Sequence, residues 1–99
     1  MKPDTEQLRL TVERMHHCRA RLAQSVPVRE RHGTATVWEG VVHVFDLTGH
    51  PKATRAYAWS SPIERSDKRR FFAVLHVPPV TSPVEAVRAA IVAEKRSGA

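Results

Sequence analysis

Residues 36–47 read TVWEGVVHVFDL, and this stretch decides the fold class. Its valines and aromatic rings are typical of a β-strand, because branched and ring side chains pack well on a pleated surface. The same composition predicts a second strand over residues 53–60 and a third over residues 69–77. The links between these strands are too short for the crossover that a parallel pair needs, so we predict an antiparallel sheet.

Apolar residues at helical spacing flank the three strands. Within residues 4–24 they recur every three or four positions and form one stripe, made of Leu8, Val12, Met15, Cys18 and Leu22. Residues 83–96 predict a second helix, because Ser82 can cap it and Glu85 suits its third position. We therefore predict an α+β fold of order α-β-β-β-α, one domain over residues 1–99, in which both helices pack on one face of a three-stranded antiparallel sheet.

Two segments of the chain resemble parts of a known family. Residues 49–52 read GHPK between the first two predicted strands, and residues 85–91 read EAVRAAI in the second helix. In this order they resemble the double-stranded-RNA-binding domain, an αβββα fold whose loop with Gly, Pro and His enters the minor groove. The resemblance implies that His50 and Lys52 contact nucleic acid. The lysines with which that family begins its second helix are absent, because residues 82–85 read SPVE.

Alternation along the strands predicts a sheet face that neither helix covers. In the second strand, large amphipathic side chains alternate with small ones, and the small ones can lie beneath helices. The uncovered face then holds seven residues that we predict to form a binding surface: His43, Arg55, Tyr57, Trp59, Arg70, Phe72 and His76. The alternative is that a β-bulge reverses the alternation and that Tyr57, Trp59 and Phe72 belong to the core.

An exposed surface of rings and guanidinium groups suits two functions. Tyr, Trp and Arg are enriched in protein interfaces, so we expect a homodimer or another protein partner bound through this face. Rings interleaved with Arg also stack bases and hold phosphates, so the second hypothesis is a module that binds nucleic acid or another polyanion. The two hypotheses are not exclusive.

The composition sets further limits. The chain has 99 residues, 16 Lys and Arg against 10 Asp and Glu, and a formal net charge of +6, which attracts anionic partners. Its single cysteine cannot form an internal disulfide, which is typical of a reducing compartment. No apolar run approaches the roughly 20 residues that cross a bilayer, and the first residues are polar. We expect a cytoplasmic protein that does not enter the membrane.

The sequence predicts no catalytic residue, no metal ligand and no cofactor. His16, His17 and Cys18 are adjacent, but consecutive helical residues point in different directions and cannot hold one ion together. Cys18 lies on the apolar stripe of the first helix, so we expect a buried and unreactive thiol. The glycines form no phosphate-binding loop. The sequence favours a non-enzymatic binding domain over an enzyme or a small-ligand binder with a pocket between sheet and helices, because the core is small.

Overall fold

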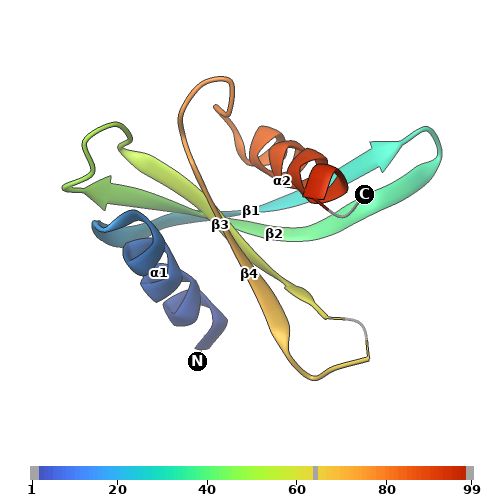
Figure 1. Cartoon of the computed structure of the whole chain (residues 1–99), viewed down its shortest axis with the longest axis horizontal. Helices are drawn as coiled ribbons and strands as arrows, with labels where there is room; N and C mark the ends of the chain where they lie inside the picture. Colours follow the sequence, from blue (N-terminus) through green and yellow to red (C-terminus); the bar gives the residue numbers. More distant parts are fainter. Residues whose placement is uncertain (1–2, 64, 98–99) are drawn as a thin grey trace.

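The structure, a computed structural model, describes residues 3–63 and 65–97 and contains two helices and a four-stranded antiparallel sheet (Figure 1). In chain order the elements are α1 (Pro3–His16), β1 (Arg19–His32), β2 (Ala35–Thr48), β3 (Arg55–Pro62), β4 (Arg69–Leu75) and α2 (Pro83–Ser97). The strands lie in the order β1-β2-β3-β4. The prediction of three strands is wrong, because part of the predicted first helix and the segment after it form β1.

The first helix ends at His16 rather than near residue 24. His17 has a φ of 53°, the left-handed conformation in which helices commonly end. The chain then alternates in a strand pattern, and Ala20 and Val28 point into the core. Pro27 is tolerated because β1 is an edge strand and Pro27 pairs with Val41 at a position where its nitrogen faces away from β2.

A tight turn joins β1 to β2. His32 pairs with Ala35, so the turn contains only Gly33 and Thr34, and Gly33 has a φ of +64°. Glycine at the first position of a two-residue turn matches the twist of the two strands that it connects. Along this hairpin the register shifts between Leu22 and Gln24, where Ala23 forms a bulge. The bulge moves Leu22 to the opposite face from the one that continued alternation would give.

The two helices pack on opposite faces of the sheet, and Figure 1 shows them on either side of the crossing strands. Ala56 and Ala58 of β3 lie in the core cluster formed with α1. Tyr57 and Trp59, which alternate with them, lie in the cluster formed with Val87 of α2. The prediction that both helices cover one face is therefore wrong, because each face of the sheet receives one helix.

The aromatic face is covered and belongs to the core. Tyr57 and Trp59 are each 2 % exposed. The Trp59 ring stacks on Phe72 with 5.2 Å between ring centroids, and Trp38 meets Trp59 edge-on at 5.9 Å. Since Val87 and Ala86 of α2 pack on this layer, the open face of rings that alternation predicted is not present.

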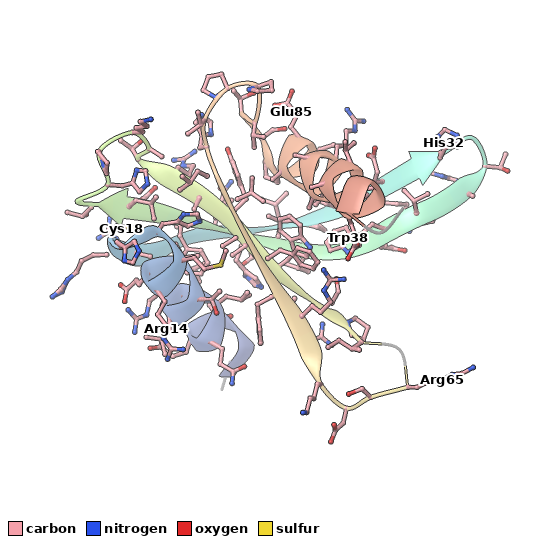
Figure 2. All side chains as sticks on the ribbon, in the orientation of Figure 1. Arg14, Cys18, His32, Trp38, Arg65 and Glu85 are labelled. Atoms are coloured by element: carbon pink, nitrogen blue, oxygen red, sulfur yellow. The ribbon has the colours of Figure 1, made fainter. Side chains whose placement is uncertain are left out.

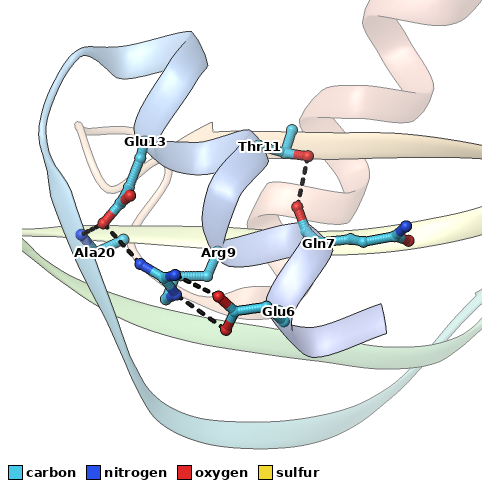
Figure 3. A network of polar contacts seen from close by, with 6 residues as sticks. All are labelled: Glu6, Gln7, Arg9, Thr11, Glu13 and Ala20. Atoms are coloured by element: carbon cyan, nitrogen blue, oxygen red, sulfur yellow. Dashed lines mark hydrogen bonds and ion pairs between the residues drawn. The ribbon is translucent and has the colours of Figure 1, made fainter. Parts of the chain in front are cut away.

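A network of polar contacts fixes α1 against β1 (Figure 3). The Glu13 carboxylate accepts hydrogen bonds from the Ala20 backbone N–H at 2.8 Å and from Arg9 at 3.1 Å. Arg9 also pairs with Glu6 one turn earlier. Glu13 thus joins the last turns of α1 to the start of β1. Leu8 and Val12 pack the same helix on the sheet, so both polar and apolar contacts hold α1 in place.

The two hairpins separate along part of their length. The pairing of β2 with β3 runs from Asp46–Arg55 to His43–Ala58 and includes no residue beyond that pair. We call the space between residues 36–42 of β2 and residues 59–62 of β3 the slot. Two features oppose ladder pairing there: Arg69 donates to the Ser60 carbonyl at 3.2 Å, and Pro62 has no N–H. The Trp38 indole reaches across the slot and donates to Ser61 Oγ at 3.2 Å.

A capping box begins α2. The Glu85 backbone N–H donates to Ser82 Oγ at 3.2 Å, and the Glu85 carboxylate accepts from the Thr81 N–H at 2.8 Å. The Thr81 hydroxyl donates to the same oxygen at 2.6 Å. Ser82 therefore satisfies one free N–H group of the first turn, that of Glu85, as residues 82–85 predicted, and the Glu85 carboxylate fixes the residue before the cap.

The burial of Trp59 leads to a first prediction. Trp59→Ala leaves a cavity between β3 and α2 and should lower the free energy of unfolding by about 3–5 kcal/mol in a denaturant titration. The control is Trp38→Ala, which removes a half-buried ring and should cost less. A loss below about 1 kcal/mol for Trp59→Ala would contradict the covering of this ring by α2.

The capping box leads to a second prediction. The hydrogen bonds from Thr81 lower the pKa of Glu85 below its ordinary 4.5, so the carboxylate stabilises the fold above that pH and loses this effect as the pH falls through the lowered pKa. We expect Glu85→Ala to melt below wild type at neutral pH, with the difference in Tm closing in acid. Ser82→Ala chiefly removes the hydrogen bond to the Glu85 backbone N–H, which does not titrate, and leaves the contacts with Thr81 that lower the pKa most, so it should keep most of its difference in Tm. A difference for Glu85→Ala that does not change with pH would be inconsistent with this account.

Candidate anion-binding surface

A row of charged side chains crosses the sheet at the end remote from α2. Arg21 of β1 pairs with Asp46 of β2, and Asp46 pairs with Arg55 of β3. His76, the first residue after β4, donates its backbone N–H to the Arg55 carbonyl at 2.9 Å. Four chain segments therefore contribute neighbouring side chains to one line. Arg19 lies two residues from Arg21 and so points to the same face.

The strand pattern explains why this row is exposed. Ala20, Phe45 and Ala56 point into the cluster beneath α1, so their neighbours in sequence point to the opposite face. On that face the α2 cluster includes Val44 and Tyr57 but none of the residues in the charged row. Arg19 and Arg21 are exposed because no helix reaches this end of the sheet on their side.

The positive charges of the row are only partly compensated. Arg55 Nε lies 3.5 Å from Asp46 Oδ1, and both side chains are partly exposed. Arg19 and Arg21 have no ion-pair partner within residues 3–63 and 65–97. An excess of guanidinium groups beside one shared carboxylate gives this surface a positive potential, which attracts anions.

The β2–β3 loop adds another cation. His50 Nδ1 accepts two backbone hydrogen bonds at 3.0 Å, from the N–H groups of Lys52 and Ala53. The His50 ring also meets His16 of α1 edge-on at 6.2 Å. These contacts fix the loop, and the exposed Lys52 side chain extends from it into solvent. We define the basic end by its members: Arg19, Arg21, His50, Lys52, Arg55 and His76.

A buried tyrosine borders the basic end. The Tyr57 hydroxyl and His76 Nδ1 are hydrogen bonded at 2.5 Å. Burial raises the pKa of Tyr57, so the phenol stays protonated and neutral. His76 is thereby held between the aromatic layer under α2 and the open charged row. This contact fixes the imidazole at the edge of the basic end.

The residues predicted for the aromatic face are distributed over three places. Tyr57, Trp59 and Phe72 lie beneath α2, and Arg70 lies over the Phe72 ring at 5.1 Å and pairs with Glu94. His43 lies on the opposite face, where its Nδ1 is 2.8 Å from Ser25 Oγ.

Only Arg55 and His76 of the predicted face, together with the loop residues His50 and Lys52, lie at the basic end. Sequence analysis missed Arg19 and Arg21 because it placed them in a helix. The alternation of residues 19–22, RARL, was the signal that could have identified them.

The remaining side chains of the described residues offer little reactive chemistry. No group of three or more His, Cys, Asp or Glu side chains there could hold a metal ion. Burial raises the pKa of the half-buried Cys18 thiol, which lowers its fraction of reactive thiolate. No helix among the described residues is long and apolar enough to cross a membrane.

Comparisons with protein families, with curated proteins and with solved structures found no match to this chain. The resemblance of residues 49–52 and 85–91 to the double-stranded-RNA-binding domain therefore stays a prediction.

Proposed function

We propose that this domain binds the phosphate backbone of a nucleic acid through its basic end. The observation that carries the proposal is the pair Arg19 and Arg21, two exposed guanidinium groups without carboxylate partners beside Arg55 and Lys52. The planar guanidinium suits phosphate oxygens because it donates two parallel hydrogen bonds. The net charge of +6 supports the same partner class.

Contacts to phosphates, rather than stacking on bases, follow from the burial of the rings. Tyr57 and Trp59 are each 2 % exposed and offer no surface to a base. Phosphate contacts carry no sequence information by themselves, so the proposed binding is nearly independent of sequence. A cytoplasmic location, which the single cysteine predicts, would bring the domain into contact with RNA and, in a cell without a nucleus, with DNA.

Self-association is a second candidate function, favoured by apolar side chains that remain exposed along α2. Val92 of α2 and Val37 of β2 are each 49 % exposed. Two surface hollows meet at Val92 and Arg88: one lies beside Ala89, the other beside Ile91. We propose this surface, in place of the covered aromatic face, as the contact of a homodimer.

Nucleic-acid binding is tested with fluorescein-labelled duplexes of about 16 base pairs, DNA and RNA, and with a single strand. Wild type should bind each probe at about 50 mM salt, and if three phosphates are neutralised it should lose about 40-fold in affinity for a duplex and about 20-fold for the single strand at 200 mM. The double variant Arg19→Glu/Arg21→Glu should remove most of the binding and lower the salt slope by about 2.

The control for this test is Arg65→Glu/Lys68→Glu in the β3–β4 turn, which changes the net charge equally. Figure 2 shows Arg65 far from the labelled Cys18 end of the sheet. This variant should keep the wild-type salt slope. Equal losses for the two double variants would mean that net charge alone attracts the probe, and no binding at low salt would overturn the proposal.

Self-association is tested by light scattering over a range of protein concentrations. Wild type should have the mass of a dimer, and Val92→Glu should give a monomer because a carboxylate would be buried in the contact. Met15→Glu is the control, since Met15 is similarly exposed, at 53 %, but lies on α1. A monomeric wild type, or a dimer that persists in Val92→Glu, would refute this contact.

A further inference from the structure

The slot exposes the backbone edge of β2. Leu47 donates its N–H to the Thr54 carbonyl at 2.9 Å, so odd-numbered residues of β2 direct their backbone groups toward β3. By this alternation Glu39 and Val41 direct their N–H and C=O groups into the slot. Neither residue has a register partner in β3, since the pairing ends at His43–Ala58. Two successive positions of the strand are therefore available for pairing with another chain.

Hollows lie on both sides of this edge. On the α1 side a hollow of about 460 Å³ is bordered by Leu8, Val41, Pro62 and Arg69, among others. On the α2 side a hollow of about 230 Å³ is bordered by Phe72 and Ile91, and Trp38 borders both. Side chains that alternate along an inserted strand would thus find space on each side of the sheet.

The charged side chains that border the slot indicate which kind of peptide it can bind. Glu39 is compensated by Arg29, with 2.8 Å between the guanidinium nitrogen and the carboxylate. Arg69 is held by Ser60 and has no carboxylate partner among the described residues. Val41 is 46 % exposed beside it. A ligand that fits the slot would therefore place a negative charge beside Arg69 and an apolar group against Val41.

We propose that the slot binds an extended peptide segment of a partner protein. The segment pairs its backbone with Glu39 and Val41 of β2, places an acidic side chain at Arg69, and packs an apolar side chain against Val41 and Pro62. Main-chain hydrogen bonds supply affinity in this mode, and alternate side chains supply specificity. This binding site is separate from the basic end, because the slot lies beyond His43 and the charged row lies at Asp46.

The test begins with a phage-displayed library of random peptides of about eight residues, the usual length of a strand or slightly more. Selection on the full wild-type chain should enrich peptides that contain Asp or Glu near an apolar residue. Val41→Pro, which removes the edge N–H, should bind the enriched peptides at least about tenfold more weakly. Ser25→Pro is the control, because by the same alternation its nitrogen lies on the outer edge of β1, outside the slot.

A second measurement does not depend on any variant of the protein. The best peptide is synthesised with single N-methylated amides along its length. Strand pairing predicts weaker binding for methylation at every second residue and little change at the residues between, since only alternate N–H groups face β2. Arg69→Gln should weaken the binding of acidic peptides more than the binding of peptides in which Asp or Glu is replaced by Asn or Gln.

Three outcomes would overturn the proposal. One is a library that enriches no peptide on wild type over Val41→Pro, provided that circular dichroism shows the variant folded. Another is a series of N-methylated peptides in which the loss of affinity does not alternate between successive residues. The third is a cross-linking result in which a second copy of this chain occupies the slot, seen as a bond between Val41→Cys subunits that excludes the peptides.

Discussion

Two short helices cover a sheet built on two long strands, and this mismatch in length shapes the whole molecule. α1 and α2 have 14 and 15 residues, which correspond to about 21 and 23 Å of helix. β1 and β2 have 14 residues each, or about 46 Å of strand. Each helix therefore covers about half of one face. The open half of one face carries the basic end, and the open half of the other exposes Glu39 and Val41 at the slot.

The parts of the fold that sequence analysis located are those whose signals are local. Strands near β2, β3 and β4 and the helix α2 follow from branched residues, short links and the capping pattern of residues 82–85, which the contacts of Ser82 and Glu85 confirm. β1 was missed because Met15, Cys18 and Leu22 stand at helical spacing, and because Pro27, which disfavours helical geometry in the residue before it, predicted the end of that helix and a loop after it. An edge strand tolerates that proline, but edge position is a property of the whole sheet.

The candidate site was less predictable than the fold, for a related reason. The alternation of large and small side chains in β3 correctly predicted that Tyr57 and Trp59 share one face of the sheet. The same pattern does not indicate which face a helix covers. It also placed His43 on that face, whereas His43 pairs with Ala58 on the other. The charged row exists only once β1 pairs with β2, which brings Arg21 opposite Asp46. Sequence analysis cannot locate a surface that combines residues of β1, β2 and β3, the β2–β3 loop and His76 until the register of the strands is known.

We propose that one uncovered end of the sheet, and not the charge of the chain as a whole, contacts nucleic acid. The most direct measurement is an NMR titration of the ¹⁵N-labelled chain with a short DNA duplex at low salt, followed amide by amide. The account predicts shift changes concentrated at Arg19, Arg21 and residues 50–55, with residues 65–68 unchanged. Changes spread evenly over the β3–β4 turn and the outer side of α2 would contradict it.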